Sequence, residues 1–247
     1  MKRLGLILPE TICDIIICLP IAKWYADRDY EVIWPIDASI INNFIDYIDY
    51  VKFFPIENNC HEARSICRTM NCDKIIDLSL FTILHSSPFN IEIYERQNVF
   101  SYDEFMYQLA GVPFEEKWNL QIKRNLERED ELYNQLVKQD AYYVTITKTD
   151  EGEYQLGGLN IPLQRIEVMP LTASVFDWIK ILSNATAQIV VDGAFISLIE
   201  QLKLPVKVER HILLRPHKYT AVLYDGEFKD IVRTKFDWLV AKQAPSN

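Results

Sequence analysis

Two patterns of hydrophobic and polar residues alternate along the chain: short, mostly apolar segments, and longer segments in which apolar and charged residues are mixed. In the N-terminal part, predominantly apolar segments of strand length lie at residues 3–8, 30–35, 50–55 and 74–80. Segments of helix length separate them, at residues 14–27, 38–47 and 59–70. Strands that alternate with helices are typical of βαβ units, so this part is predicted to form a parallel sheet flanked by helices.

The segment 101–140 has a different pattern, because charged residues recur there at helical spacing without any strand-like run. The pattern predicts two helices broken at Gly111 and Pro113, the second continuing to about residue 138 with its charges on a solvated face. We expect residues 112–140 to form a helical linker between two domains.

The alternation of strands and helices resumes after this linker. Strands are predicted at residues 141–148, 165–170, 187–192 and 205–209, with a turn-rich loop or hairpin at 151–162. Helices are predicted at residues 174–185, 193–203 and about 227–242. The chain is therefore expected to have an α/β fold of two Rossmann-like domains with parallel sheets, at residues 1–111 and 141–225, followed by a C-terminal helix and tail at 226–247.

Charge and composition narrow the classes of function. The 247 residues carry a formal net charge of −9, which argues against a broad basic surface for nucleic acid but leaves a local basic groove open. No apolar run reaches the roughly 18 residues of a membrane span, and the N-terminus does not have the pattern of a signal peptide, so a cytoplasmic protein is expected. The five cysteines include no C-x-x-C pair and match no standard zinc module, which favours reduced thiols and predicts no metal site.

One candidate site lies where a predicted strand ends at Asp192 and a helix opens directly after Gly193. A glycine lets a ligand approach the backbone, and the first N–H groups of the helix would point outward at the positive end of its dipole. This geometry suits phosphate, although an ordinary βα turn capped by Asp192 accounts for the residues equally well. The stretch lacks both G-x-G-x-x-G and G-K-[ST], so neither a dinucleotide dehydrogenase nor a P-loop enzyme is favoured.

Asp14 stands in a comparable position, after the first strand. An aspartate at the start of a helix can accept hydrogen bonds from free backbone N–H groups, which alone would account for it. The same position is also the carboxyl edge of the strands, where open α/β sheets bind ligands. Asp77 and Ser79 should lie at this edge, either touching an acceptor or serving as buried turn residues, and His85 would lie in a loop over the cleft.

Two longer stretches bring these residues together: "ICDIIICLPIAKWYADRDYEVIWP" around Asp14, and "VMPLTASVFDWIKILSNATAQIVVDGAFISLIEQLKLPV" around Gly193. The first resembles the N-terminal signature of the ADP-heptose:lipopolysaccharide heptosyltransferase family, where a Gly-Asp pair opens a helix that runs into an apolar segment. The second is similar to that family's donor-binding half, where a strand ending V-x-x-D-[TS]-[GA] is followed by x-x-H-L-x-x-A-L-x-x-P.

This resemblance implies a GT-B glycosyltransferase that moves a sugar from a nucleotide diphosphate donor to an acceptor hydroxyl, without a metal or another cofactor. It makes Asp14 the general base that removes the proton of the acceptor hydroxyl. On the donor side it implies Asp192, Gly193, Ala194 and Ser197, with Lys148 as the counterpart of a family lysine and Arg215 as a partner for diphosphate oxygens. The acceptor side would include Asp77, Ser79 and His85.

The chain departs from the family pattern at three positions. Cys13 stands where glycine is usual, Gly193 where threonine or serine is common, and Ser197 where histidine is frequent. Heptose as the donor sugar is therefore not implied. The expected acceptor is a glycan or a lipid-linked saccharide, with a hydroxylated base in DNA as the second candidate. A protein that kept the fold but lost the chemistry, and serves in nucleotide binding or interaction, is the alternative of a different class.

Overall fold

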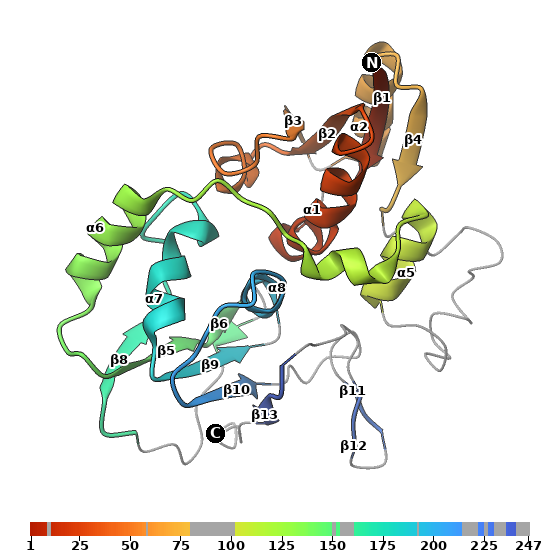
Figure 1. Ribbon diagram of the computed structural model, residues 1–247. Coiled ribbons are helices and arrows are strands. Elements are labelled where there is room, and N and C mark those ends of the chain that lie inside the picture. Colours follow the sequence, from red (N-terminus) through yellow and green to blue (C-terminus); the bar gives the residue numbers. More distant parts are fainter. Residues whose placement is uncertain are drawn as a thin grey trace. The chain divides into compact units, whose positions relative to one another are not determined.

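The computed structural model describes residues 1–8, 11–57, 59–79, 102–149, 152–153, 161–191, 193–213, 222–224, 227–229 and 236–240. The chain divides into two compact units, Met1–Lys123 and Arg124–Asn247 (Figure 1). The division falls inside the segment 112–140, where the sequence predicts the linker.

The N-terminal unit is built on a four-stranded parallel sheet in the order β3-β2-β1-β4. Its strands are β1 (Lys2–Ile7), β2 (Tyr30–Asp37), β3 (Val51–Ile56) and β4 (Lys74–Asp77). Its main crossover helices are α1 (Ile12–Ala26) and α2 (Cys60–Thr69). The steps from β1 to β2 and from β3 to β4 run in opposite directions across the sheet, so right-handed crossovers place α1 and α2 on opposite faces (Figure 1).

Helix α1 is buried along most of its length, which explains why its sequence is apolar on nearly every side. The sheet lies on one side, and α5 (Tyr102–Ala110) and the 3-10 turn η2 (Phe114–Trp118) pack against it as well. Two buried tyrosines connect α1 with α5 through hydrogen bonds: the Tyr107 hydroxyl donates to the Ile17 carbonyl (2.9 Å), and the Tyr25 hydroxyl donates to the Ala110 carbonyl (2.7 Å). These contacts fix the helix that carries Asp14.

Gly5, in the middle of β1, is required by the packing of α2. A Cβ atom on this residue would lie 2.7 Å from the Sγ and 2.9 Å from the Cβ of Cys67, which is completely buried. We expect Gly5→Ala to lower the free energy of unfolding of the N-terminal unit by about 1–3 kcal/mol, because overpacking pushes α2 away from the sheet. Urea unfolding measures this effect, and Gly193→Ala is the control, since its added Cβ would lie 3.9 Å from the nearest atom.

Two helices predicted in this unit do not form as expected. Residues 38–47 make turns around the 3-10 turn η1 (Ile41–Asn43), and residues 119–125 are not helical. The Lys123 N–H donates to the Tyr47 carbonyl (2.8 Å), and the Tyr50 hydroxyl donates to the Gln121 carbonyl (3.1 Å). These tertiary hydrogen bonds occupy backbone groups of residues 119–125 that the predicted helix would have used for its own hydrogen bonds.

The C-terminal unit contains a five-stranded parallel sheet in the order β13-β10-β9-β5-β8. Its strands are β5 (Tyr142–Ile146), β8 (Gln164–Glu167), β9 (Ala187–Val191), β10 (Glu209–Leu213) and β13 (Leu239–Val240). Its helical elements are α6 (Leu126–Leu136), η3 (Val175–Trp178), α7 (Ile179–Asn184) and α8 (Ala194–Gln201). Short antiparallel pairs join β6 (Lys148–Thr149) to β7 (Gly152–Glu153), and β11 (Val222–Tyr224) to β12 (Glu227–Lys229).

These two sheets confirm the predicted α/β fold of two Rossmann-like domains. Helices α7 and α8 lie on the same face of the C-terminal sheet (Figure 1), as right-handed crossovers in one direction require. Within the described part of the chain, no helix is long and apolar enough to cross a membrane.

The helix predicted at about 227–242 is wrong where this segment is described. Residues 227–229 and 239–240 are strands, and β13 pairs in parallel with β10. The buried Glu200 carboxylate accepts hydrogen bonds from the Phe236 N–H (3.2 Å) and from the Trp238 indole (2.6 Å). The residues of this segment therefore pair with the edge of the sheet and bind Glu200 instead of forming the apolar face of a helix.

Candidate active site

The order of strands locates a ligand position in the N-terminal unit. The chain runs from β1 to β2 and β3 on one side and returns to β4 on the other, so the order reverses between β1 and β4. Open α/β sheets bind ligands outside the carboxyl ends of the strands at such a reversal. The residues at this edge are the loop from β1 into α1, with Asp14, and the end of β4, with Asp77 and Ser79.

Asp14 lies in the first turn of α1 and is half-buried. The N-cap residue of the helix is Thr11, whose Oγ1 accepts a hydrogen bond from the Asp14 N–H (3.1 Å). The Thr11 hydroxyl also donates to Oδ2 of Asp14 (2.8 Å). Capping is therefore the task of Thr11, and the positive end of the helix dipole favours a charged carboxylate at Asp14.

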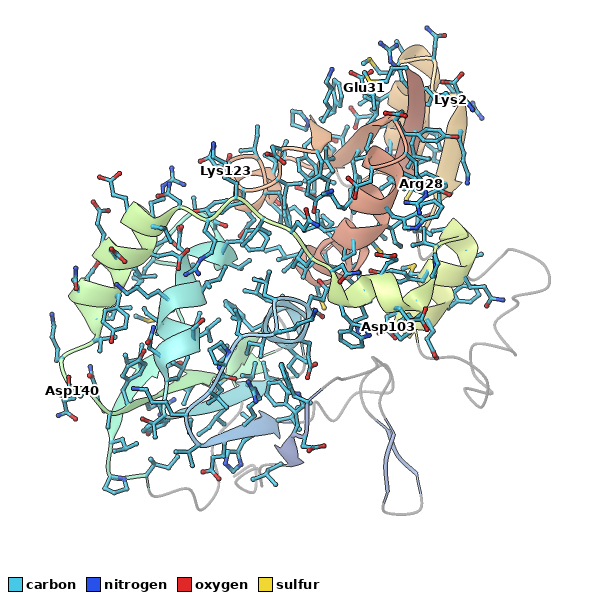
Figure 2. All side chains as sticks on the ribbon, viewed as in Figure 1. Lys2, Arg28, Glu31, Asp103, Lys123 and Asp140 are labelled. Atoms are coloured by element: carbon cyan, nitrogen blue, oxygen red, sulfur yellow. The ribbon has the colours of Figure 1, made fainter. Side chains whose placement is uncertain are left out.

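A buried ion pair lies behind this turn of α1. The Lys117 ammonium of η2 pairs with the Asp103 carboxylate of α5, and both side chains have 0% exposure. Asp103 is labelled in Figure 2. The ammonium also lies 4.7 Å from the centroid of the Trp118 ring. Burial raises the pKa of the Cys18 thiol well above its usual value, and the nearby carboxylates of Asp14 and Asp103 raise it further. Cys18, one turn beyond Asp14, is therefore a neutral thiol near this pair.

No pattern in the sequence indicates this pair. Asp103 and Lys117 are fourteen residues apart and belong to separate helical segments, so no helical spacing connects them.

Asp77 and Ser79 lie together at the end of β4, as the strand pattern predicts. Ser79 donates to Oδ1 of Asp77 through its N–H (3.1 Å) and its hydroxyl (2.6 Å). Arg64 of α2, which the sequence pattern did not indicate, forms an ion pair with Oδ2 and donates to it from Nε (2.8 Å). Ser39 binds Asp37 at the end of β2 in the same way, so this D-x-S turn is a repeated way of ending a strand.

A corresponding position exists in the C-terminal unit, between β5 and β9. The chain leaves β5 for β8 on one side, and the later strands lie on the other side of β5. Thr147 follows β5 at this edge, and Gly193, two residues past the end of β9, is the N-cap residue of α8. Gly193 has an extended backbone (φ 170°) that any residue could adopt. Among the described residues, a Cβ there would meet only the Val191 carbonyl, at 3.9 Å, so these residues leave space at the start of α8.

The other predicted donor residues have the following places. Ala194 is the first residue of α8, Ser197 is buried in its first turn, and the backbone of Lys148 directly follows Thr147. Asp192 and Arg215 of the donor side, and His85 of the acceptor side, lie outside the described residues. The donor or acceptor role assigned to each of these residues stays a prediction.

A polar group at the ends of β5 and β8 was not predicted from the sequence. The buried Thr147 donates from its hydroxyl to the Glu167 carboxylate (3.3 Å), and the guanidinium of Arg165 lies 3.5 Å from the same carboxylate. The pairing of β5 with β8 brings these residues together across the sheet. In the sequence, the only indication of this group was that polar residues recur two positions apart at the ends of the two strands, at Thr145 and Thr147 and at Arg165 and Glu167.

Comparison with known proteins defines the fold. The sequence matches no protein-family model and no curated protein. The glycosyl transferase family 9 structure from Veillonella parvula is 12% identical with a TM-score of 0.55, covering 88% of this chain and 82% of that one. ADP-heptose lps heptosyltransferase II from E. coli is 13% identical with a TM-score of 0.51, covering 87% and 84%.

A third similar structure is the iron-containing dodecameric glycosyltransferase TibC from enterotoxigenic E. coli, at 11% identity and a TM-score of 0.54. The match covers 86% of this chain and 58% of that one. The resemblance to heptosyltransferases that two sequence stretches indicated is thereby confirmed for the fold, which is of the GT-B type.

Proposed function

We propose that this protein is a glycosyltransferase that moves a sugar from a nucleotide diphosphate donor to an acceptor hydroxyl of a glycan or a lipid-linked saccharide. One observation carries the proposal: each unit has a residue selected by the family resemblance at its reversal of strand order, Asp14 in one and Gly193 in the other. The similar solved structures are themselves named as glycosyltransferases, which supports the same class.

On the acceptor side, Asp14 acts as the general base. Its carboxylate takes the proton of the acceptor hydroxyl while the hydroxyl oxygen attacks the anomeric carbon of the donor. The new glycosidic bond forms as the bond between the anomeric carbon and the diphosphate oxygen breaks. The hydrogen bond from Thr11 to Oδ2 orients the carboxylate for this transfer.

On the donor side, the start of α8 holds the diphosphate. The N–H groups of Gly193 and Ala194, with the helix dipole behind them, stabilise the negative charge that develops on the leaving diphosphate. The family resemblance assigns Lys148 and Arg215 to the diphosphate as positively charged partners. Under this proposal the protein itself supplies the field that stabilises the leaving group, and transfer proceeds without a metal.

A thermal-shift screen against nucleotide diphosphates and their sugars tests the donor site. One of these compounds, at about one hundred times its dissociation constant, is expected to stabilise the folded protein by about 2.7 kcal/mol. Gly193→Val should remove the shift and leave the melting temperature without ligand unchanged, because the backbone is extended and an added Cβ comes no closer than 3.9 Å to the described residues.

The control for this screen is Val208→Ala, at a position of the same unit that is 70% exposed, which should keep the full shift. If none of the compounds shifts the melting temperature of the wild type, the donor site is wrong and a non-catalytic interaction protein is favoured. A shift that survives Gly193→Val places the donor elsewhere.

A further inference from the structure

The end of α2 brings two cysteine thiols into contact. Asn71 has a left-handed backbone (φ 53°), and its N–H donates to the Arg68 carbonyl (2.9 Å), while the Cys72 N–H donates to the Cys67 carbonyl (3.0 Å). This pair of hydrogen bonds is the Schellman motif, in which the residue two positions past the cap packs its side chain on the last turn of the helix. Here both side chains are cysteines.

Gly5 gives the two sulfur atoms a common space. A Cβ on Gly5 would lie 2.7 Å from Sγ of Cys67 and 3.3 Å from Sγ of Cys72, so both sulfurs occupy the volume above this glycine of β1. Cys72 also packs against the apolar cluster that contains Cys67. The backbone hydrogen bond between the two residues limits their Cα separation to about 6.9 Å from standard bond lengths, which is close to the upper end of the range seen in disulfides.

The other cysteine of this cluster is out of reach of Cys67. Cys60 packs against the same apolar cluster but lies seven residues earlier on α2. Seven residues of α-helix separate two Cα atoms by about 10.5 Å along the axis, which is too far for a disulfide. Cys72 is therefore the partner that the fold gives to Cys67.

We propose that Cys67 and Cys72 form a redox modification site, a dithiol that a small-molecule disulfide such as oxidised glutathione converts into a disulfide. This goes beyond the proposed function and does not depend on it. The product would connect the last turn of α2 covalently to the residues that lead into β4.

The two cysteines have different roles in this reaction. Burial raises the pKa of Cys67 to about 12, with further contributions from Cys72, so Cys67 is the resolving thiol. Cys72 is partly exposed and is the thiol that an oxidant can reach; burial raises its pKa, and the positive charge of Arg3 opposes this rise. The Cys72 thiolate attacks one sulfur of oxidised glutathione, whose S–S bond breaks and releases one glutathione thiolate that takes up a proton.

The second step closes the protein disulfide. Cys67 loses its proton to water and attacks Sγ of Cys72, and the second glutathione leaves. Two protein thiols are oxidised by two electrons, and one glutathione disulfide is reduced to two glutathione molecules. The contact between the sulfurs compensates for the small fraction of Cys67 thiolate, since a held neighbour acts at a high effective concentration.

Peptide mapping of the wild-type protein tests the proposal. After treatment with oxidised glutathione and alkylation, trypsin cleaves behind Arg64, Arg68 and Lys74, so the two cysteines fall in separate peptides, 65–68 and 69–74. The expected result is a disulfide-linked pair of these peptides that reduction separates, and an intact mass that is lower by two hydrogen atoms.

Cys60→Ser is the matched control and should keep the linked pair, whereas Cys67→Ser should leave glutathione attached to Cys72. Glutathione adducts on peptides 65–68 and 69–74 without a link, linkage of either peptide to another cysteine, or no reaction at all would each overturn the proposal. The wild-type map alone decides the result, so it does not rely on the folding of a variant.

Discussion

Asp14→Asn is expected to lower the rate of sugar transfer by about 10²–10⁴-fold, with donor binding unchanged. Asparagine keeps the size of the side chain and can still accept the hydrogen bond from Thr11, but it cannot take the proton of the acceptor hydroxyl. Product formation from the donor identified in the thermal-shift screen measures the rate. The same screen on the variant measures donor binding.

Asp27→Asn is the matched control, because Asp27 caps the opposite end of the same helix, where it pairs with Lys23. This variant should transfer at the wild-type rate. Full turnover in Asp14→Asn would remove Asp14 as the base. An equal loss in both variants would mean that disturbing α1 is enough to stop the reaction.

The alternation of apolar runs predicted the sheets well, for a physical reason. Strands of a parallel sheet are covered on both faces, so they appear as continuous apolar runs such as residues 32–36 of β2, and helices must separate them. The position of Gly193 was also predictable, because a buried strand ends just before it and an apolar helix begins just after it. Local patterns therefore defined both the fold class and one end of the candidate site.

The features of the structure that local sequence patterns could not predict depend on contacts between residues that are distant in the sequence. The segment 236–240 has the apolar spacing of a helix, yet Glu200 and the edge of β10 hold it extended. Arg64 and Asp77 meet only because α2 packs beside β4. Tertiary contacts decided these cases, and the pairs of residues that make them carry no common spacing in the sequence.

The pair formed by Asp103 and Lys117 is the clearest such case, and it leads to the second large expected effect. Lys117→Met should lower the free energy of unfolding of the N-terminal unit by about 3–5 kcal/mol, because it leaves the Asp103 carboxylate buried without its partner charge. Hydrogen exchange of the α1 amides is the appropriate measurement, since the chain has two units and a single unfolding transition cannot be assumed.

The double variant Asp103→Leu/Lys117→Met separates the charge from the packing. Replacing both partners with apolar side chains removes the uncompensated charge, so most of the lost stability should return. Lys180→Met in the C-terminal unit, which breaks the more exposed pair with Asp130, should cost less than about 1 kcal/mol when hydrogen exchange of the α7 amides is measured, and serves as the control. A loss from Lys117→Met as small as that of the control would show that water reaches Asp103. Because α5 and η2 pack against α1, water there would also loosen the layer behind Asp14.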